Sequence, residues 1–245
     1  MISIISSLYN SDKYLKRYAK HLLRIGKYLN KKHVDFEVII IANSPSVIEK
    51  DYLYRISDLL TQIKIVEVER ESLYASWNRG AKLAKGDAIT FWNVDDIRFG
   101  RALIKGEKLV KLGADIVYFT FIILKKHKYY RYIPVPRLFF NLPLKYNRNY
   151  FRTGMFCGPF FLVSKIAFEK IGYFDVQFKI AGDFEWCVRA ADKRLNFCRS
   201  LIFAGMYIKD GNTLSGSNKS IKLQEIENQI VYRRYEVKSK NNILK

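Results

Sequence analysis

Two adjacent carboxylates and an amide follow a short apolar run in the first half of the chain. Residues 84–96 read AKGDAITFWNVDD, and the run ends on Asn93, Asp95 and Asp96. In open α/β sheets, ligands bind beyond the carboxyl ends of the strands. Carboxylate and amide oxygens suit hard cations such as Mg²⁺ and Mn²⁺, and Mg²⁺ is commonly held by carboxylates together with substrate phosphates. The segment therefore predicts a divalent cation that bridges a nucleotide diphosphate at a strand end.

Buried strands and amphipathic helices alternate through the first 124 residues. Apolar runs predict strands at residues 2–8, 36–41, 63–68, 88–92 and 115–124. Apolar residues at helical spacing predict helices at 13–29, 45–60, 74–84 and 102–112, the second with Pro45 in its first turn. This alternation is typical of a doubly wound α/β sheet with parallel strands.

The second half of the chain is less regular. Residues 125–152 are basic and aromatic and contain three prolines, which indicates a hairpin or irregular insertion. Further on, the pattern predicts helices at 164–171 and 183–191 and a strand at 195–203. A polar, glycine-rich loop at 209–217 then precedes an amphipathic helix at 221–237.

The composition favours a folded domain that binds anionic partners. Of the 245 residues, 49% are hydrophobic, which allows a packed core, and the length suits one α/β domain with a C-terminal extension. The net charge of +20 favours nucleic acid, an anionic membrane surface or phosphorylated substrates as partners. The lysine excess is spread along the chain, so genome base composition is an alternative source of the charge. The sequence specifies no oligomeric state.

The cysteines and the first residues point to the cytoplasm. Cys157, Cys187 and Cys198 are odd in number and unpaired in spacing, as expected of reduced thiols rather than a disulfide framework or a zinc site. The chain starts without a basic leader and cleavage site, and no apolar run approaches the roughly 18 residues of a membrane span. We therefore expect a cytoplasmic protein that meets a membrane only from its surface.

Four motifs occur in a characteristic order: ISIISSLYN at 2–10, FEVIIIANSPS at 36–46, SWNRG leading into NVDD at 76–96, and GDFEWCVR at 182–189. With this order, the chain resembles the family-2 nucleotide-sugar glycosyltransferases with the GT-A fold. The resemblance implies an α/β domain with a Rossmann-like, mostly parallel sheet and flanking helices. It covers residues 1–205, with a donor half at about 1–124 and an acceptor half at about 125–205, and leaves 206–245 as a C-terminal loop and helix.

The resemblance assigns residues 93–96 to the diphosphate end of a donor site. It implies that Asp95 ligates the bridging cation, Mn²⁺ or Mg²⁺, with Asp96 beside it. Asn93 stands where the family usually has an aspartate; its amide can accept a hydrogen bond from a ribose hydroxyl but supplies no charge. The alternative for these carboxylates is an acidic helix start, which the helix dipole stabilises.

Three further residues are implied to bind the donor. Asn43 takes the place of an aspartate that holds the nucleobase in such enzymes, although a plain strand-to-helix turn is the alternative. Asn78 matches an asparagine that fixes the loop near the nucleotide, and Arg79 is either a phosphate contact or a solvated side chain. Trp77, where an arginine is frequent, fits core packing.

Asp183 matches the catalytic base of inverting members of the family. Such a transfer needs a carboxylate that takes the proton from the acceptor hydroxyl as this oxygen attacks the anomeric carbon. Glu185 is the other candidate for the base, and chemistry alone does not decide between the two carboxylates. The structural alternative for Asp183 is that it only caps the N-terminus of a helix. Gly158 falls where the family often places acceptor-side backbone.

The resemblance implies an inverting enzyme that moves a hexosyl or N-acetylhexosaminyl group from a nucleotide diphosphate-sugar to a cell-surface glycan or lipid-linked acceptor, as in polysaccharide biosynthesis. The basic segment at 125–152 then contacts an anionic membrane surface or forms a wall of the acceptor site. Ala42, Asn93 and Gly182 stand where acids are usual, so an inactive, glycosyltransferase-like binding protein is the alternative. A nucleic-acid-binding protein is disfavoured, because no nucleic-acid-binding motif accompanies the basic charge.

Overall fold

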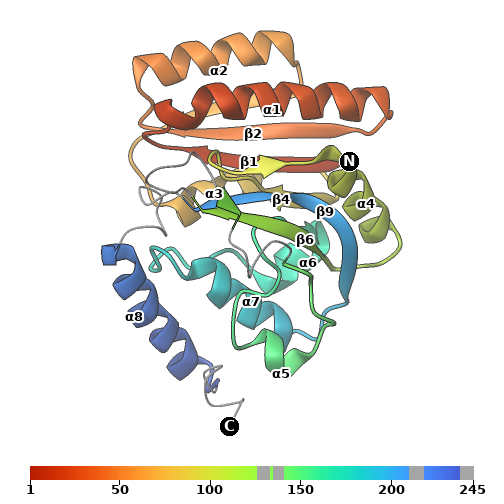
Figure 1. Ribbon diagram of the computed structural model, residues 1–245, viewed down its shortest axis with the longest axis vertical. Helices are drawn as coiled ribbons and strands as arrows, with labels where there is room; N and C mark the ends of the chain where they lie inside the picture. The colour runs from red at the N-terminus through yellow and green to blue at the C-terminus, as the bar shows by residue number, and fades with distance from the viewer. Residues whose placement is uncertain (126–132, 135–140, 210–217, 238–245) are drawn as a thin grey trace.

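A mixed sheet of nine strands forms the centre of the computed structural model, which describes residues 1–125, 133–134, 141–209 and 218–237 (Figure 1). The strands are β1 (Ile2–Leu8), β2 (Phe36–Asn43), β3 (Ile63–Val68), β4 (Ala88–Phe91), β5 (Ile97–Arg98), β6 (Ile116–Lys125), β7 (Ile133–Pro134), β8 (Leu162–Ser164) and β9 (Phe197–Lys209). Their order is β3-β2-β1-β4-β8-β6-β9-β5, and β7 pairs with β6. The helices are α1 (Asp12–Lys31), α2 (Val47–Leu59), α3 (Leu73–Leu83), α4 (Gly100–Lys111), α5 (Arg148–Phe151), α6 (Lys165–Ile171), α7 (Gly182–Asp192) and α8 (Asn218–Arg234).

Strands β1 to β4 form the parallel half of the sheet that the alternating pattern predicts. β1 pairs with β2 from Ile2 opposite Phe36 and with β4 from Ile2 opposite Ala88, and β2 also pairs in parallel with β3. The strands β1, β2 and β4 are buried almost throughout, because helices cover both faces of the sheet. All four strands end at the same edge of the sheet.

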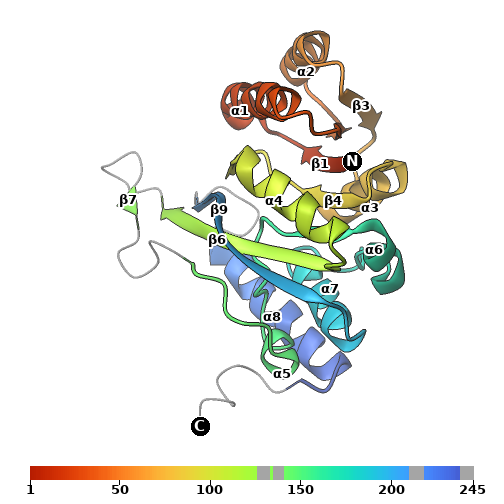
Figure 2. The same cartoon turned by 90° about the vertical axis from the view of Figure 1, so that its right-hand side faces the viewer.

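The sheet changes direction at β8, a strand that the sequence did not reveal. β8 pairs antiparallel with β4 and with β6, and β6 then runs parallel to β9. Three residues are too few for a strand pattern to be read, and we predicted only the helix that follows them. Figure 2 shows β6 and β9 as long neighbouring strands between α4 and α7. The predicted α/β class is confirmed, and the sheet is parallel as far as β4 and mixed beyond it.

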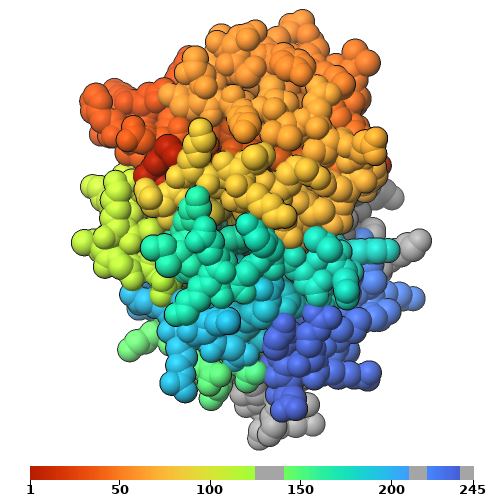
Figure 3. All heavy atoms as spheres, turned by 180° about the vertical axis from the view of Figure 1, so that it is seen from behind, coloured from red at the N-terminus to blue at the C-terminus, as the bar shows by residue number. Residues whose placement is uncertain are grey.

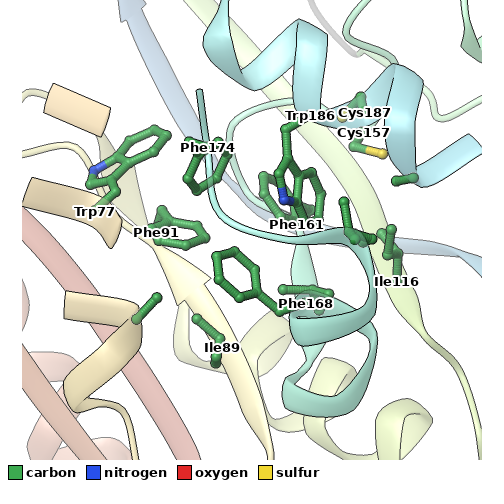
Figure 4. Close-up of a cluster of buried hydrophobic side chains, with 14 of the residues drawn as sticks. Trp77, Ile89, Phe91, Ile116, Cys157, Phe161, Phe168, Phe174, Trp186 and Cys187 are labelled. Carbon is green, nitrogen blue, oxygen red and sulfur yellow. The ribbon is translucent and has the colours of Figure 1, made fainter. Parts of the chain in front are cut away.

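Two buried apolar clusters lie on opposite faces of the sheet. One packs α1, α2 and α4 against residues such as Ile4 and Val38. The other packs α3, α6 and α7 against Ile5 and Phe91, and aromatic rings dominate it (Figure 4). Trp77 is 6% exposed and its ring centre lies 4.8 Å from that of Phe91, so its predicted place in the core is confirmed.

The start of α2 differs from the prediction that placed Pro45 in the first helical turn. The Ser46 hydroxyl accepts a hydrogen bond from Glu49 N (3.1 Å), and the Glu49 carboxylate accepts one from Ser46 N (2.9 Å). This reciprocal capping box makes Ser46 the N-cap and leaves Pro45 outside the helix. The Glu49 carboxylate also accepts a hydrogen bond from Ser11 N (2.6 Å), so it ties the starts of α1 and α2 together.

The C-terminal helix α8 packs against α7, at the end of the molecule away from α1 and α2 (Figure 1). Val231 is fully buried, and the Tyr232 ring meets Phe184 edge-on with 5.6 Å between ring centres. In Figure 3, α8 (dark blue) adjoins the surface of the teal segment that includes α6.

Among the described residues, no helix has both the length and the apolar character of a membrane span. Residues 126–132 and 135–140 of the predicted insertion, and residues 210–217 of the predicted loop, lie outside the described residues.

Candidate active site

Polar residues gather where the parallel strands end. Asn43 is the last residue of β2, and residues 93–96 follow β4. Tyr9 follows β1, and Arg70 follows β3. Because these strands are parallel and paired in register, their ends share one edge of the sheet. The structure therefore brings the predicted donor residues at 43 and 93–96 to a common edge, the expected place for a ligand.

The turn at residues 93–96 is held by hydrogen bonds to its backbone. Asp96 N donates to Asn93 O (3.0 Å) and closes the turn. Trp92 Nε1 donates to Asp96 O (3.1 Å), and the Arg17 guanidinium of α1 donates to Asp95 O (2.5 Å). The turn is thus fixed from β4 and from α1, while the side chains of Asn93 and Asp95 stay partly exposed.

The two adjacent carboxylates of this turn lie in different environments. The Asp96 side chain is buried, and its Oδ1 accepts a hydrogen bond from Ile208 N of β9 (3.0 Å). Burial, and after it the charge of Asp95, raises the pKa of Asp96 well above its usual range. Asp95 remains partly exposed at the edge of the sheet. Asp96 therefore anchors the turn to β9, whereas Asp95 is the more exposed of the two carboxylates, and its role as a cation ligand stays a prediction.

The protein ligands for a cation at this edge are few. No group of three or more histidine, cysteine or acidic side chains gathers in the part of the chain that the structure describes. The Asp95 carboxylate and the Asn93 amide oxygen nevertheless fit a Mg²⁺ or Mn²⁺ ion, since such ions usually take their remaining ligands from substrate phosphates and water. The residues present suit a cation that binds together with a nucleotide.

Asn43 and Arg79 both bind Glu71, in the segment between β3 and α3. The Asn43 amide donates to Glu71 O (2.7 Å) and accepts from Glu71 N (2.9 Å), and the side chain is buried. The Arg79 guanidinium forms an ion pair with the Glu71 carboxylate (2.9 Å) and is about half exposed. Asn43 therefore positions the segment around Glu71, which Arg79 also contacts. Binding of the nucleobase by Asn43 stays a prediction.

Asn78 links α3 to the segment that precedes α7. Its Nδ2 donates to Phe174 O (2.8 Å), and its Oδ1 accepts from Phe174 N (2.9 Å). These two bonds hold the Phe174 ring in the aromatic cluster, where it meets Phe91 at 5.1 Å between ring centres. The structure thus places Asn78 as a connection between the predicted donor and acceptor halves.

An aromatic and cationic pair at the same sheet edge was not singled out from the sequence. The Arg70 guanidinium lies over the Tyr9 ring, 3.3 Å from the ring centre, and Tyr9 is 48% exposed. Such a pair offers a flat face and a positive charge to a nucleobase or a phosphate. The available signal was Tyr9 itself, which lies in the motif ISIISSLYN directly after a buried strand.

Asp183 is the second residue of α7 and lies beside the hydroxyl group of Tyr74. Its Oδ1 accepts a hydrogen bond from Phe184 N (2.8 Å) and lies 3.4 Å from the Tyr74 hydroxyl. Burial raises the pKa of Asp183 to about 6, although the hydrogen bonds from Phe184 and Tyr74 oppose the shift. The N-cap of α7 is Ala181, so Asp183 is not an N-cap carboxylate. Its raised pKa and partly exposed side chain suit a group that accepts a proton.

Glu185, the other candidate base, belongs to a buried network. Its carboxylate forms a two-point ion pair with Arg189 (2.7 and 2.9 Å) and accepts a hydrogen bond from the Tyr235 hydroxyl. The side chain is buried. A carboxylate that is already bound by a guanidinium and a phenol is closed off from a substrate. The geometry therefore favours Asp183 over Glu185, a choice that the sequence left open.

Gly158 occupies a crowded position next to β6. Its φ is +66°, and a Cβ atom there would lie 2.5 Å from Cε1 of Phe121. Both the backbone conformation and the lack of space require glycine. The preceding Cys157 packs beside Cys187 in the aromatic cluster of Figure 4. Packing accounts for Gly158, and its role on the acceptor side stays a prediction.

Comparison with known proteins tests the family resemblance. The family model described as Glycosyl transferase family 2 matches residues 3–172, more than half of the chain. The chain belongs to glycosyl transferase family 2. The match confirms the predicted family and, with it, the glycosyltransferase class.

Solved structures of similar fold include two glycosyltransferases. Staphylococcus aureus TarS in complex with UDP-GlcNAc is 14% identical, with a TM-score of 0.68 over 96% of this chain and 71% of that chain. The mannosyltransferase PcManGT from Pyrobaculum calidifontis in complex with GDP-Man and Mn²⁺ is 14% identical, with a TM-score of 0.69 over 95% of this chain and 64% of that chain. This chain spans 64% of TarS 1–349 and 44% of a longer TarS chain. These structural similarities confirm the GT-A fold. Among curated proteins, none matches the chain significantly.

In this family-2 glycosyltransferase, a glycine precedes the candidate base where an acidic residue is usual. A Cβ atom on Gly182 would lie 2.6 Å from Cε2 of Tyr74. The Tyr74 ring is fixed, because its hydroxyl donates to Ile180 O (2.6 Å) and lies beside Asp183. The ring therefore occupies the space that a larger residue at 182 would need.

Replacing Asp96 by alanine should destabilise the protein. The change leaves the buried Ile208 N–H without its acceptor, which costs about 1–3 kcal/mol in the free energy of unfolding. Urea denaturation measures this loss. Asp95→Ala is the matched control, because it removes the same side chain from a partly exposed position and should cost less. Equal losses for the two variants would contradict the anchoring role of Asp96.

Proposed function

We propose that this glycosyltransferase moves a hexosyl or N-acetylhexosaminyl group from a nucleotide diphosphate-sugar to a hydroxyl group, with inversion at the anomeric carbon. The observation that carries the proposal is the Asp183 carboxylate, which is partly exposed and has a raised pKa, two residues before a glutamate that is already engaged. Such a carboxylate suits the general base of a single displacement.

The donor is proposed to bind across the carboxyl edge of β1 to β4. The exposed Tyr9 ring with Arg70 offers a face for the nucleobase. Asp95 and Asn93 would hold Mn²⁺ or Mg²⁺ on the diphosphate, and Arg79 is a further phosphate contact. When bound, the cation neutralises charge on the leaving diphosphate. Structures of TarS with UDP-GlcNAc and of PcManGT with GDP-Man and Mn²⁺ support a nucleotide-sugar and a divalent cation.

Three predicted donor residues act indirectly in this proposal. Asn43 and Asn78 hold the segments at Glu71 and Phe174, and Asp96 holds the turn that presents Asp95. Their amides and carboxylate are engaged in hydrogen bonds within the protein. They contribute to the donor site by fixing its walls.

In the proposed reaction, the acceptor oxygen forms a bond to the anomeric carbon while Asp183 takes its proton. The bond from that carbon to the diphosphate oxygen breaks on the opposite face, and its electron pair leaves with the nucleoside diphosphate. A pKa of about 6 keeps Asp183 ionised at neutral pH and makes it a stronger base than an ordinary aspartate. Because the side chain is partly exposed, it can release the proton to water.

The acceptor is proposed to be a cell-surface glycan or a lipid-linked glycan, reached in the cytoplasm at the inner face of the membrane. Leu142 and Leu144 are exposed (62% and 49%), and the exposed Lys145 follows them. Apolar side chains next to a cation suit an anionic lipid surface, and the net charge of +20 strengthens that attraction. The competing use of this segment is as a wall of the acceptor site.

Replacing Asp183 by asparagine should leave donor binding nearly unchanged and lower turnover by roughly 10²-fold or more, because the general base is lost. In the unmodified enzyme, protonation of Asp183 below its pKa of about 6 should make kcat/KM rise with pH through that value and then level off. A pH series of initial rates measures both effects. Unchanged turnover in Asp183→Asn would remove Asp183 as the base, and donor binding without any transfer would favour the inactive binding protein.

Replacing Asp95 by alanine should weaken the binding of nucleotide in the presence of Mn²⁺ by about tenfold or more, the size of one charged contact. A thermal-shift panel of nucleotide diphosphates and nucleotide-sugars, with and without Mn²⁺, first identifies the donor, because ligand binding raises Tm. Titration calorimetry then compares Asp95→Ala with Asp58→Ala, which removes an exposed aspartate of α2. Equal affinities in these two variants would exclude Asp95 from the site.

A further inference from the structure

A buried glutamate of α8 binds the backbone directly in front of the proposed catalytic base. Glu227 Oε1 accepts a hydrogen bond from Lys179 N (2.8 Å). Glu227 Oε2 accepts hydrogen bonds from Ile180 N (2.9 Å) and Ala181 N (2.8 Å). The Glu227 side chain is only 5% exposed. Three consecutive N–H groups thus converge on one carboxylate, a concave arrangement that favours an anion.

This carboxylate binds the backbone that leads into α7. The N-cap residue is Ala181, whose side chain has no oxygen to accept a hydrogen bond, and the structure shows no side-chain cap there. Buried N–H groups without acceptors cost free energy, and a negative charge at a helix N-terminus is favourable. Glu227 therefore stabilises the conformation of residues 179–181 from a helix that lies 46 to 48 positions further along the chain.

The same segment is held from its other side by α3. The Tyr74 hydroxyl donates to Ile180 O (2.6 Å) and lies 3.4 Å from Asp183 Oδ1. Ile180 is thus bonded through its N–H to α8 and through its carbonyl to α3. Since Asp183 follows this segment by two residues, the direction of its carboxylate depends on both contacts.

Helix α8 has further polar attachments to the acceptor half. The Arg234 guanidinium pairs with Asp175 (2.6 Å), and the Tyr232 hydroxyl donates to Thr153 O (3.2 Å). Just beyond the helix, the Tyr235 hydroxyl donates to Glu185 of α7. These contacts and the Glu227 contact join α8 to the half of the domain that contains Asp183.

We propose that Glu227 is a positioning residue, which holds residues 179–181 so that Asp183 faces the acceptor hydroxyl; this inference rests on the proposed function of Asp183. Glu227 does not touch the substrate in this arrangement. Its role requires both the length and the charge of glutamate, because two oxygens must accept three N–H groups. A helix that the sequence assigned to a C-terminal appendage at 206–245 thereby becomes part of the active site.

The pH dependence of kcat/KM reports the charges around Asp183, and a residue that only stabilised the fold would leave it unchanged. Burial is the main reason for its raised pKa, and the charge of Glu227 on α8 adds to the increase. The Tyr74 hydroxyl of α3 opposes it through a hydrogen bond, and Cys187 lies within electrostatic reach on α7 itself. Removing the Glu227 charge should therefore lower the pKa of Asp183 and move the acidic limb of kcat/KM to lower pH.

The test compares Glu227→Gln with Glu225→Gln in the full chain. Glu225 is exposed on the same helix, so its replacement removes the same charge without touching residues 179–181. In Glu227→Gln, one oxygen becomes an NH₂ group that faces an N–H donor. We expect kcat to fall about tenfold or more, because a small misplacement of a catalytic group is costly, with the donor KM within about twofold of the original. Hydrogen exchange at the amides of residues 179–181 should become faster. Glu225→Gln should change neither kcat nor the rate of this exchange.

Glu227→Asp separates position from charge. It keeps the charge but shortens the side chain, so kcat should fall while the acidic limb stays near its original pH. Equal kcat and equal amide exchange in Glu227→Gln and Glu225→Gln would overturn the inference. If Glu227→Gln does not fold, as judged by circular dichroism, Glu227→Asp decides, and an unchanged kcat and exchange in that variant would overturn the inference. If the unmodified chain neither binds nor transfers any nucleotide-sugar, the proposed function fails, whereas the amide exchange still decides whether Glu227 holds residues 179–181.

Discussion

The arrangement of the molecule depends on one short strand pairing, between β4 and β8. β4 pairs in parallel with β1 on one side and antiparallel with β8 on the other, so it joins the two halves of the domain. The Thr90 hydroxyl reinforces the junction by donating to Phe161 O (2.6 Å), and the buried Arg98 donates to Thr90 Oγ1 (2.6 Å). Below the sheet, the Phe91 ring contacts both Phe161 and Phe174. Because β4 also leads into the turn at 93–96, this junction sets how the candidate donor edge faces the helix of the candidate base.

Many polar residues of the motifs hold the walls of the site in place. Asn43 and Asn78 each use both ends of the amide to bind a single backbone residue, and Asp96 accepts from a strand of the other half. These groups are buried, where an unsatisfied polar atom costs more than a bond contributes. Each is therefore a strong constraint on the segment that it holds. Asp95 is less buried than these groups, and its proposed contact with a cation depends on that exposure.

Helix α7 shows how environment separates two neighbouring carboxylates. Asp183 and Glu185 lie in the same motif and the same helical turn, and both are acidic. Arg189 and Tyr235 engage Glu185, whereas Asp183 has a hydrogen bond from Phe184 N and a neighbouring phenol. The difference lies in what the rest of the chain brings to each side chain.

The sequence by itself determined the parallel half of the fold, the order of its motifs and the edge at which Asp95 lies. Those features follow from local patterns: apolar runs that form buried strands, helical spacing, and strand ends that share an edge because the strands are parallel. Only the tertiary structure decided that a strand at 162–164 joins the halves, that Asp96 is buried, that Asp183 is available where Glu185 is not, and that Glu227 holds the segment before Asp183. Each of these outcomes depends on groups that meet across the fold, such as Ile208 with Asp96 and Tyr235 with Glu185. Local propensity carries no information about such pairs, because burial and hydrogen-bond partners are set by packing between distant parts of the chain.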